Sequence, residues 1–542
     1  MGEAMHDPQG GNPERQLGGV DFILHRAAEL YPDRVAIDDR LNGSRVTYAE
    51  LRRRAIQLAR ALESLGVRKG DVVASAFRNE AMAFEVLFAC CMLGAVTAPI
   101  NTRLAPAEAR EYLDRIGAVA FVGLHSLHAF VEGTRVRHTV LRGESGSVLP
   151  AGTHDYETFL AAQSGEPFPA RASWGDPYLI CMTGGTTGGS KGVVGSHAGC
   201  LLDMLAIANH WTIRNGYRAL CCAPVYHAAG LSWACMPVLW QGGTLVFPAS
   251  AAFDPAAFLR IVTEEGIDTF FIVPAMVTPL HGKWDGVPMT GVKSIALASA
   301  PVPRPLREKV AEMFPAADAL VCYGMTECLT ITSQQPRDFL QHGESSGEPA
   351  LTARVRILDD AGLPAPRGTP GNVVTRTFAQ ALRYQNDPAN TAATFRPCPG
   401  DPEALDWLYT GDVGFLDEGG RITLLDRAKD IIITGGENVA SSEVEAVLAL
   451  HARVRECAVI GLADEKWGEM VCAVIVAVDG TDERGLAQEL LALCRDRLAG
   501  YKAPKRFVFT AALPRSAFGK VLKRDLRGQA FTTTFDAGTL RA

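Results

Sequence analysis

The segment TGGTTGGSKG, residues Thr183–Gly192, holds five glycines, three threonines, one serine and one lysine in ten residues. Glycine has no Cβ, so the backbone N–H groups of such a loop can approach a ligand closely. The hydroxyls and the ammonium add further donors. The apolar run Tyr178–Met182 before it predicts a buried strand that leads into the loop. These features favour a loop that binds a polyphosphate over a flexible linker, because a linker seldom follows directly from an apolar strand. The loop differs from the Walker A motif, in which the lysine is followed by serine or threonine.

Length and composition limit the class of protein. A chain of 542 residues is too long for one compact core, so two or more domains are expected. The formal net charge of −7 argues against a general nucleic-acid binder. No uninterrupted apolar run is long enough to span a bilayer. The thirteen cysteines include no C-x-x-C pair and read as small buried hydrophobic residues, so we expect a cytoplasmic protein.

The order of apolar patterns predicts an α/β fold. Helical patterns and short apolar runs alternate up to about Thr330, which indicates a large domain of parallel-rich sheets flanked by helices. From Ala353 to Thr377 short β-like runs predict a small β portion, and strand–helix alternation returns after Asp426. The predicted organisation is a disordered tail at 1–19, a large N-terminal domain at 20–426, a small mobile α+β domain at 427–530 and a tail at 531–542.

Four further segments present groups that can do chemistry. Each taken alone has an ordinary explanation, since most charged residues are merely exposed. They are Tyr323–Glu327 at the C-terminal end of a predicted strand, the predicted turn Tyr409–Asp412, the segment Asp426–Asp430 with the turn Thr434–Asn438 after the next strand, and the loop Leu513–Lys520, which ends in a lysine.

Taken together, these motifs resemble those of the adenylate-forming superfamily, which includes acyl- and aryl-CoA synthetases, peptide-synthetase adenylation domains and luciferases. The glycine-rich loop matches the phosphate loop of that family, and the other four segments match in order and spacing. Weaker matches extend the resemblance over roughly Asp21 to Arg527, one of them at Tyr384 through Pro388 with Thr391. The resemblance implies a carboxylic acid as the small-molecule substrate. The acid attacks the α-phosphate of ATP to give an acyl-adenylate and pyrophosphate, and a thiol, usually that of coenzyme A, then displaces AMP. An anion attacking a polyphosphate needs positive charge and oriented donors.

The resemblance also implies roles for individual residues. Thr326 contacts the α-phosphate, Glu327 holds Mg²⁺, and Lys520 bridges the substrate carboxylate and the α-phosphate. Lys429 is the hinge about which the small domain rotates between the two half-reactions, and His227 positions the substrate. The remaining nucleotide and coenzyme A positions are Thr183, Gly184, Gly185, Thr186, Thr187, Gly188, Lys191, Ser299, Ala300, Tyr323, Gly324, Asp412, Arg427, Gly435 and Gly436.

The candidate acyl pocket is lined mostly by apolar or small residues, without an evident carboxylate to hold an α-amino group. An aryl or a short-to-medium alkyl acid therefore fits better than an amino acid. The lining residues are His227, Ala228, Ala229, Trp233, Ile272, Pro274, Ala298, Ser299 and Ala300.

Several departures leave alternatives open. Gly184 and Ser190 replace the usual serine and proline of the phosphate loop, Asn372 replaces a glutamate, and Ala440–Ser441 replaces a Tyr-Pro pair near the thiol tunnel. A stand-alone enzyme that loads a carrier protein, and a relative that activates nitrite to diazotise an aryl amine, are therefore kept beside the CoA ligase. A degenerate binding protein is disfavoured because Lys191, Glu327, Asp412 and Lys520 are all retained. A homodimer is compatible with the sequence.

The segment Gly343–Gly347 matches the Gly-x-Ser-x-Gly pattern of a hydrolase nucleophile elbow. That elbow requires a strand before the serine and a helix after it. Pro349 follows within two residues, so we predict a loop and disfavour a hydrolase.

Overall fold

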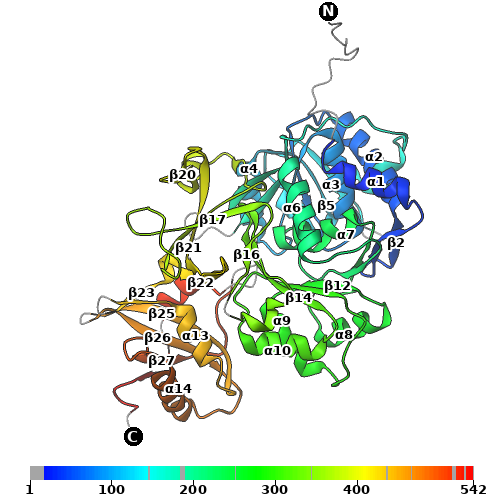
Figure 1. Cartoon of the computed structure of the whole chain (residues 1–542). Coiled ribbons are helices and arrows are strands. Elements are labelled where there is room, and N and C mark those ends of the chain that lie inside the picture. Colours follow the sequence, from blue (N-terminus) through cyan, green and yellow to red (C-terminus); the bar gives the residue numbers. More distant parts are fainter. Residues whose placement is uncertain are drawn as a thin grey trace, which may run out of the picture. The chain divides into compact units, whose positions relative to one another are not determined.

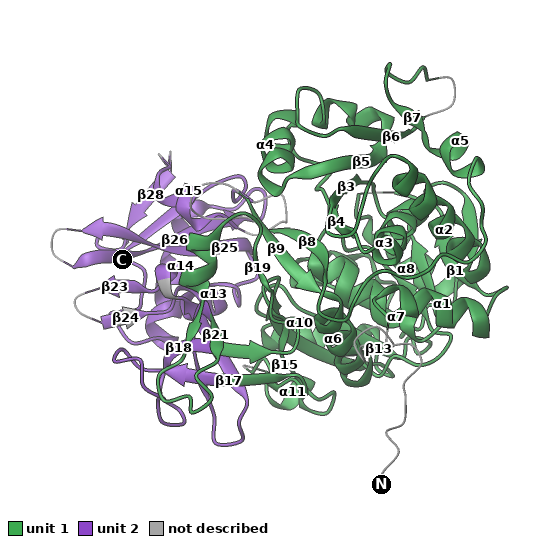
Figure 2. Cartoon of the chain, turned by 90° about the horizontal axis from the view of Figure 1, so that it is seen from above, with its two compact units in different colours: residues 1–355, 375–408 green, residues 356–374, 409–542 purple. Residues whose placement is uncertain are grey.

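The computed structural model describes residues 18–143, 147–183, 190–250, 252–343, 345–434, 437–464, 467–515, 521–529, 531 and 533–540. The chain divides into two compact units. Residues 18–355 and 375–408 belong to the first, and residues 356–374 and 409–540 to the second (Figure 2). The elements and their order along the chain are shown in Figure 1.

The first unit contains a nine-stranded sheet among the described residues. Its strands β14, β13, β12, β10, β11 and β1 are all parallel, and antiparallel strands flank them on both sides. In spatial order the strands are β16 (Glu348–Pro349), β15 (Leu329–Ser333), β14 (Asp318–Met325), β13 (Ser294–Leu297), β12 (Thr269–Ile272), β10 (Arg218–Leu220), β11 (Thr244–Phe247), β1 (Val35–Asp39) and β2 (Ser44–Thr47).

The first unit also contains an eight-stranded sheet among the described residues. Strands β8, β4, β3, β5, β6 and β7 are parallel, whereas β9 and β19 run antiparallel to their neighbours. In spatial order the strands are β19 (Arg383–Tyr384), β9 (Lys191–Ser196), β8 (Pro177–Thr183), β4 (Val96–Pro99), β3 (Val72–Ala76), β5 (Ala118–Leu124), β6 (His138–Arg142) and β7 (His154–Asp155).

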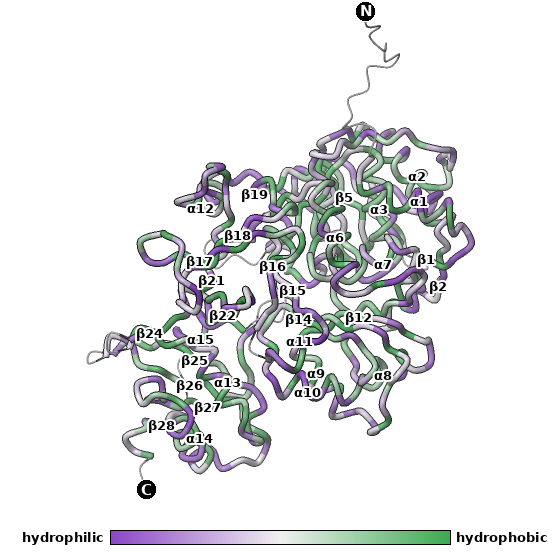
Figure 3. Tube along the Cα trace, viewed as in Figure 1, coloured by the Kyte–Doolittle hydropathy of each residue, from purple (hydrophilic) through white to green (hydrophobic). Residues whose placement is uncertain are grey.

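Helices cover both sheets, as parallel strands buried on two faces require. Helix α3 (Ala81–Leu93) is apolar on nearly every side and buried, whereas α2 (Tyr48–Ser64) has polar residues on one face (Figure 3). A core that includes both of these helices contacts one face of each sheet. The other helices of this unit are α1 (Asp21–Leu30), α4 (Pro106–Ile116), η2 (His125–Phe130), α5 (Tyr156–Ala161), α6 (His197–His210), the π-helix η3 (Ala229–Cys235), α7 (Met236–Trp240), α8 (Pro255–Glu264), α9 (Pro274–Lys283), α10 (Arg304–Met313), α11 (Asp338–Gln341) and α12 (Pro388–Thr394).

Side chains alternate between the two faces of each strand, so neighbouring residues enter different cores. In β12, Phe271 packs in the core that holds η3, whereas Phe270 and Ile272 pack on the opposite face. That opposite face is covered by α8, α9 and α10, which Figure 1 shows together beside β12 and β14. The outer face of the eight-stranded sheet has its own core with α4.

A five-stranded sheet contains residues of both units, and a six-stranded sheet belongs to the second unit. The first consists of β17 (Ala353–Leu358), β18 (Gly371–Thr377), β21 (Asp406–Leu416), β20 (Phe395–Pro397) and β22 (Ile422–Arg427). The second consists of β24 (Glu437–Val439), β23 (Ile432–Thr434), β26 (Gly468–Ala477), β27 (Arg506–Phe509), β28 (Thr533–Asp536) and β25 (Val454–Asp464). The helices of the second unit are η4 (Ala428–Asp430), α13 (Ser441–Leu448), α14 (Glu483–Arg497) and α15 (Lys523–Arg527).

Most of the predicted elements are confirmed, and three predictions need correction. The predicted turn at Tyr409–Asp412 lies inside the long strand β21 (Asp406–Leu416), and its last residue, Asp412, pairs with Arg427 of β22. The predicted tail at 531–542 contains β28, which pairs with β27. Residues 1–17 of the predicted N-terminal tail lie outside the described residues, but Gly19 is buried in the first unit.

Two further points from the sequence concern membrane-spanning segments and the nucleophile-elbow pattern of a hydrolase. None of the helices found in the described parts of the chain has the length and hydropathy of a membrane span. At the Gly343–Gly347 motif, Glu344 lies outside the described residues, the helix α11 precedes the motif and the strand β16 follows it. This order is the reverse of the strand–serine–helix order of a nucleophile elbow.

Candidate active site

Four adjacent parallel strands of the nine-stranded sheet end at one edge. Because β10, β12, β13 and β14 are parallel, the segments that follow them lie on the same side of the sheet. After β13, Ser299 and Ala300 are exposed, and Ser299 has a φ of 76°, a conformation that is uncommon for a residue with a side chain. The motif Tyr323–Glu327 ends β14 and continues beyond it. The register of the sheet therefore places these two predicted nucleotide segments side by side.

The phosphate loop joins two paired strands of the other sheet. Strands β8 and β9 form an antiparallel pair whose last register partners are Thr183 and Lys191. Both residues are half-buried. The predicted positions Gly184, Gly185, Thr186, Thr187 and Gly188 between them lie outside the described residues. The pairing of β8 with β9 fixes the two ends of the loop: the chain leaves the sheet after Thr183 and re-enters it at Lys191.

Tyr384 connects the cation and the carboxylate of the site. Its hydroxyl donates a hydrogen bond to Oε1 of Glu327 at 2.8 Å, and the Lys191 ammonium lies 4.7 Å from the centre of its ring. Lys191 Nζ also donates to Oδ1 of Asn390 at 2.8 Å, and Asn390 is held at the start of α12 by Asp387. The pKa of Tyr384 is raised by burial and by the Glu327 carboxylate. A phenol that stays protonated can keep donating to Glu327.

Sequence reasoning placed Tyr384 in a weak motif and assigned it and Asn390 no role. The available signal was the spacing of the motif, because Tyr384 lies in β19, which pairs with β9 two residues after Lys191. Cation–π contact and a neutral amide do not neutralise Lys191, and the Asp387 carboxylate, whose pKa is lowered by hydrogen bonds from Asn390 and also by Lys191, is the nearby negative charge. Within the described part of the chain, Lys191 has no carboxylate at ion-pair distance, so its charge is available to an anionic ligand.

Glu327 is a buried carboxylate, 8% exposed, at the turn between β14 and β15. Burial and the Glu327 charge both raise the pKa of the Cys181 thiol on β8, which places the two side chains close together. A pocket beside them is lined by Cys181, Ala228 and Thr326 among others. Two predicted site residues, Ala228 and Thr326, thus meet at one pocket between the two sheets of the first unit.

The predicted acyl residues divide between two faces of the nine-stranded sheet. Ala228, Trp233 and Ala298 pack in the same core, and the rings of Trp233 and Phe271 lie 6.1 Å apart in an edge-to-face arrangement. Ile272 is fully buried in the core on the opposite face, so the structure does not bring it to Trp233. Phe271 takes its place, because a shift of one residue along a strand reverses the face.

Gly324 marks the closest approach between the β14 motif and the π-helix η3. A Cβ on Gly324 would lie 1.9 Å from the carbonyl oxygen of Leu329 and 2.8 Å from Cζ2 of Trp233. Neither distance is compatible with a side chain. Glycine is therefore required here by contact with the neighbouring strand and with the indole ring.

His227 lies in the loop that precedes η3 and is half-buried. Its Nδ1 accepts a hydrogen bond from the N–H of Ala229 at 3.3 Å, which leaves the proton of the neutral ring on Nε2. Burial lowers the pKa of His227, so the ring is neutral at neutral pH. A neutral imidazole with an Nε2–H group can donate a hydrogen bond to a substrate.

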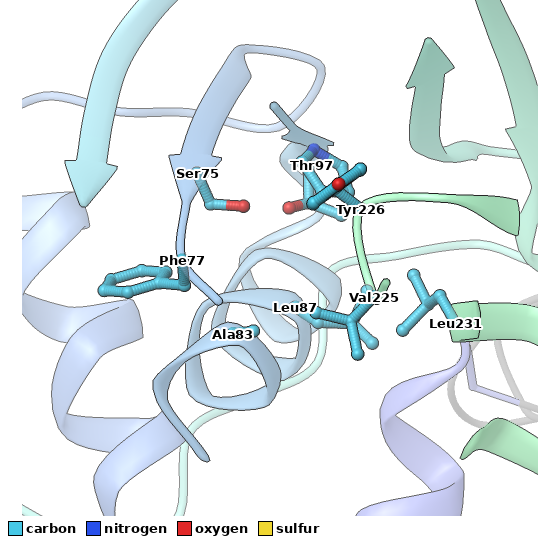
Figure 4. A pocket seen from close by; sticks show the side chains of 9 residues that line it. Ser75, Phe77, Ala83, Leu87, Thr97, Val225, Tyr226 and Leu231 are labelled. Carbon is cyan, nitrogen blue, oxygen red and sulfur yellow. The ribbon is translucent and has the colours of Figure 1, made fainter. Parts of the chain in front are cut away.

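A second pocket lies behind the loop that carries His227 (Figure 4). Ser75 of β3 and Thr97 of β4 point their hydroxyls toward each other across it. Val225 and Tyr226, which precede His227 in the chain, form part of its wall. The loop thus rests on two strands of the eight-stranded sheet.

In the second unit, Asp412 and Arg427 face each other across β21 and β22. They are register partners, and Nε of Arg427 lies 2.7 Å from Oδ1 of Asp412. Arg427 Nη1 also donates to the carbonyl oxygen of Thr410 at 3.2 Å. Asp412 is buried, 7% exposed, and follows Gly411, whose φ is 72°. The strand pairing explains why these two predicted residues act as a pair.

Lys429 lies in the short helix η4 directly after Arg427, and burial lowers its pKa. Its neighbour Asp430 forms an ion pair with Arg527 of α15 at 2.9 Å. The predicted residues Gly435, Gly436 and Lys520 lie outside the described residues.

Comparison with known proteins assigns both parts of the chain. The family model described as "AMP-binding enzyme" matches residues 24–384, and "AMP-binding enzyme C-terminal domain" matches residues 443–520. The chain is 35% identical over 505 residues to a feruloyl-CoA synthase of Amycolatopsis sp, covering 93% of this chain and 97% of that protein. It is 32% identical to an indoleacetate–CoA ligase of Aromatoleum aromaticum, covering 94% and 98%. A crystal structure of an anthranilate CoA ligase in complex with anthranoyl-AMP matches with a TM-score of 0.86 at 25% identity, covering 94% and 96%.

Proposed function

The chain belongs to the family of AMP-binding enzymes, and from that premise we propose that it joins an aromatic carboxylic acid to coenzyme A at the expense of ATP. The two-step reaction is ATP-dependent activation of an acid as its acyl-AMP with release of pyrophosphate, followed by formation of the CoA thioester. The mixed α/β fold agrees with this activity.

One observation carries the assignment of residues in the first unit. Tyr384 contacts both the Lys191 ammonium and the Glu327 carboxylate, and so brings a cation and an anion together at the start of β9. Attack of a carboxylate on a polyphosphate requires positive charge near the phosphate oxygens. We propose that Lys191 and the 183–188 loop bind the β- and γ-phosphates and that Thr326 donates to the α-phosphate.

The surroundings of Glu327 fit a magnesium ion held together with a nucleotide. Magnesium is commonly held by one or two protein carboxylates together with substrate phosphates. Glu327 is such a carboxylate, and the proposed arrangement is Glu327 together with phosphate oxygens of the nucleotide. The ion would neutralise phosphate charge, and Tyr384 would hold the Glu327 carboxylate in place through its hydrogen bond.

The acid is proposed to be aromatic. The acids named for the relatives above carry an aromatic ring, and the ring of Phe271 meets Trp233 edge to face beside Ala228 and Ala298. Small residues leave room for a planar ring, and aromatic walls favour one. We propose that His227, through its Nε2–H, orients the substrate at the opening of this pocket, with Ser299 and Ala300 near the adenylate.

The second unit is proposed to complete the site. Asp412 would accept hydrogen bonds from the ribose hydroxyls, with Arg427 fixing its position. We propose that residues 427–530 move as a small domain about Lys429, that Lys520 serves adenylation, and that Gly435 and Gly436 serve the thiol step. A lysine suits the first role because its charge sits on a long mobile stem.

The experiment that tests the function is a pyrophosphate-release screen. Purified protein, ATP and Mg²⁺ are mixed with aryl, alkyl and amino acids and with nitrite, each with and without coenzyme A. We expect release with aryl acids, and AMP with an acyl-CoA thioester when coenzyme A is present. The thioester is identified by mass spectrometry.

Other outcomes name other reactions. Pyrophosphate release that is indifferent to coenzyme A would assign a carrier protein or an amine as the acceptor. Dependence on nitrite would assign diazotisation. Pyrophosphate release with alkyl acids alone would contradict the proposal of an aromatic substrate. No pyrophosphate release with any acid would contradict the use of ATP.

A further inference from the structure

A buried carboxylate lies behind the predicted acyl pocket and takes no part in the reaction described above. Asp203 is 1% exposed on α6, and its Oδ1 accepts a hydrogen bond from the backbone N–H of Thr330 at 3.2 Å. An ionisable group is seldom buried so completely without a partner of opposite charge. Asp203 therefore needs an explanation.

Three contacts lead from Asp203 to the acyl pocket. Thr330, which donates to Asp203, is the register partner of Gly324 in the β14–β15 pair. Gly324 in turn touches the Cζ2 edge of the Trp233 indole, the edge that carries Nε1. Trp233 is a lining residue of the predicted pocket. The carboxylate and the indole ring are thus linked through Thr330 and Gly324, which lie two to four residues along β14 and β15 from Thr326 and Glu327.

Two polar atoms here lack a partner among the described residues. They are Asp203 Oδ2 and Trp233 Nε1, whereas the Thr330 hydroxyl lies close enough to the Asp203 carboxylate to offset part of the rise in its pKa that burial causes. All three side chains are more than nine-tenths buried. Each unsatisfied buried polar group costs stability, and two at one place mark a site where a ligand or water completes the bonds.

The charge state of Asp203 supports a hydrogen-bonding role. Burial raises the pKa of Asp203 to about 7, so its carboxyl group is partly ionised near neutral pH. The neighbouring thiols of Cys200 and Cys322 have pKa values raised to about 12 and stay neutral. Asp203 is therefore the titrating acceptor in this part of the pocket.

We propose that Asp203 is a specificity-determining residue that accepts a hydrogen bond from a hydroxyl group on the acid, at the end of the acid away from its reacting carboxylate. This inference rests on the proposed function, because it assigns one end of the same acyl pocket. The substrate class becomes hydroxyaryl acids.

The set of unpartnered atoms favours a hydroxyl over other substituents. A hydroxyl donates one hydrogen bond and accepts two, so it matches an acceptor at Asp203 Oδ2 and a donor at Trp233 Nε1. An ammonium group only donates and would leave the indole N–H unpaired. An unsubstituted ring would leave every one of these atoms unpaired, which a buried site disfavours strongly.

The test compares acids that differ by one ring hydroxyl. Pyrophosphate release is measured with para-hydroxycinnamate, meta-hydroxycinnamate and cinnamate, for the wild-type enzyme and for Asp203→Asn. Asparagine keeps the acceptor for the Thr330 N–H but replaces the second oxygen by a donor. Trp233→Phe, which removes the indole N–H together with part of the bicyclic ring, is the second variant.

The control is Trp211→Phe. The N–H of Trp211 is also buried without a partner, and its ring also packs edge-to-face on Phe271. It follows the end of α6, eight residues beyond Asp203, or about 12 Å along the helix axis. Trp211→Phe removes the same side-chain atoms as Trp233→Phe, also from a buried position beside Phe271.

For the wild-type enzyme, kcat/KM is expected to be about 10-fold or more higher for one hydroxylated acid than for cinnamate. Asp203→Asn is expected to bring that ratio close to one while activity with cinnamate persists, Trp233→Phe to reduce it, and Trp211→Phe to leave it unchanged. The inference is overturned if the wild-type enzyme prefers cinnamate. It is also overturned if the ratio of kcat/KM for the hydroxylated acid to kcat/KM for cinnamate is unchanged in both Asp203→Asn and Trp233→Phe. Either result leaves the proposed function intact. Failure of every acid to release pyrophosphate overturns the proposed function, and the inference with it.

Discussion

At the scale of single residues, the site depends on a tyrosine that does no chemistry. Tyr384 holds the buried Glu327 carboxylate through its hydroxyl and lies beneath the Lys191 ammonium with its ring face. Hydrogen bonds to charged groups contribute about 1.5–3 kcal/mol, more than bonds between neutral groups. The orientation of Glu327 therefore depends on one hydroxyl.

Tyr384→Phe is predicted to impair use of Mg²⁺ and ATP. Loss of the hydroxyl leaves Glu327 without its donor, so we expect the KM for Mg²⁺–ATP to rise by about 10-fold or more. The cation–π contact of Lys191 is kept, because the ring remains. The measurement is initial-rate kinetics of pyrophosphate release at varied Mg²⁺–ATP.

The matched control for this prediction is Tyr112→Phe on α4. Tyr112 is equally buried, but its hydroxyl is among the buried polar atoms of the described residues that have no partner. Its loss is expected to leave the kinetics and the melting temperature nearly unchanged. Equal effects of the two substitutions would show that Tyr384 acts only by filling space.

At the scale of elements, the β14–β15 pair determines where the motif lies. The strand β14 continues past the parallel sheet to Met325, and its register with β15 shifts between Tyr323 and Gly324. Such an irregularity bends the strand locally. The bend presents Thr326 and Glu327 at the sheet edge and brings Gly324 against η3.

Gly324→Ala is predicted to destabilise the fold and to reduce activity. The new Cβ would meet a backbone carbonyl oxygen at 1.9 Å, which no change of rotamer can relieve. Overpacking of this kind costs about 1–3 kcal/mol, and here it would also displace the motif. Thermal unfolding and pyrophosphate release measure the two effects.

Gly282→Ala in α9 is the control for that substitution. An added Cβ at Gly282 meets no atom within 4 Å, and alanine favours a helix by about 1 kcal/mol over glycine. The control is expected to leave the melting temperature unchanged or higher. A Gly324→Ala variant as stable and active as this control would refute the close-contact argument.

At the scale of the whole molecule, the proposed reaction requires residues from both units. Lys191, Thr326 and Glu327 belong to the first unit, and Asp412 and Lys520 to the second. Within the second unit, ion pairs connect α15 to η4, which carries the proposed hinge residue Lys429, and to α13: Arg527 pairs with Asp430, and Lys523 pairs with Glu445. Helix α15 is therefore attached to the segment that carries the proposed hinge.

Lys520→Ala is predicted to separate the two half-reactions. Removal of an oriented cation from the transition state should slow adenylation by about 10²-fold or more. Thioester formation from a supplied acyl-adenylate should remain nearly intact, because the thiol step does not use this lysine. Rapid-quench measurement of each half-reaction tests this, with the exposed Lys283→Ala as a control. Equal losses in both half-reactions would contradict a role limited to adenylation.

Sequence patterns alone predicted most elements, but they could not predict which side of a strand faces the site. Ile272 was predicted to line the acyl pocket, yet it packs on the other face and Phe271 meets Trp233. An apolar run that is buried on both faces has no alternating pattern to distinguish them. In the same way, Tyr409–Asp412 contains a glycine and a polar residue and was predicted to be a turn, although it lies inside the strand β21 and Asp412 pairs with β22.

The sequence by itself determined the α/β class, the positions of most strands and helices, and the identity of the motif residues. These properties follow from local hydrophobic periodicity and from motifs whose spacing is short. Tertiary structure decided the contact of Tyr384 with Lys191 and Glu327, the exclusion of Ile272 and the place of Asp203. Asp203 and Thr330 are 127 residues apart in the chain. Contacts over such separations depend on strand order and register, which are set by the packing of the whole unit and not by any local stretch of sequence.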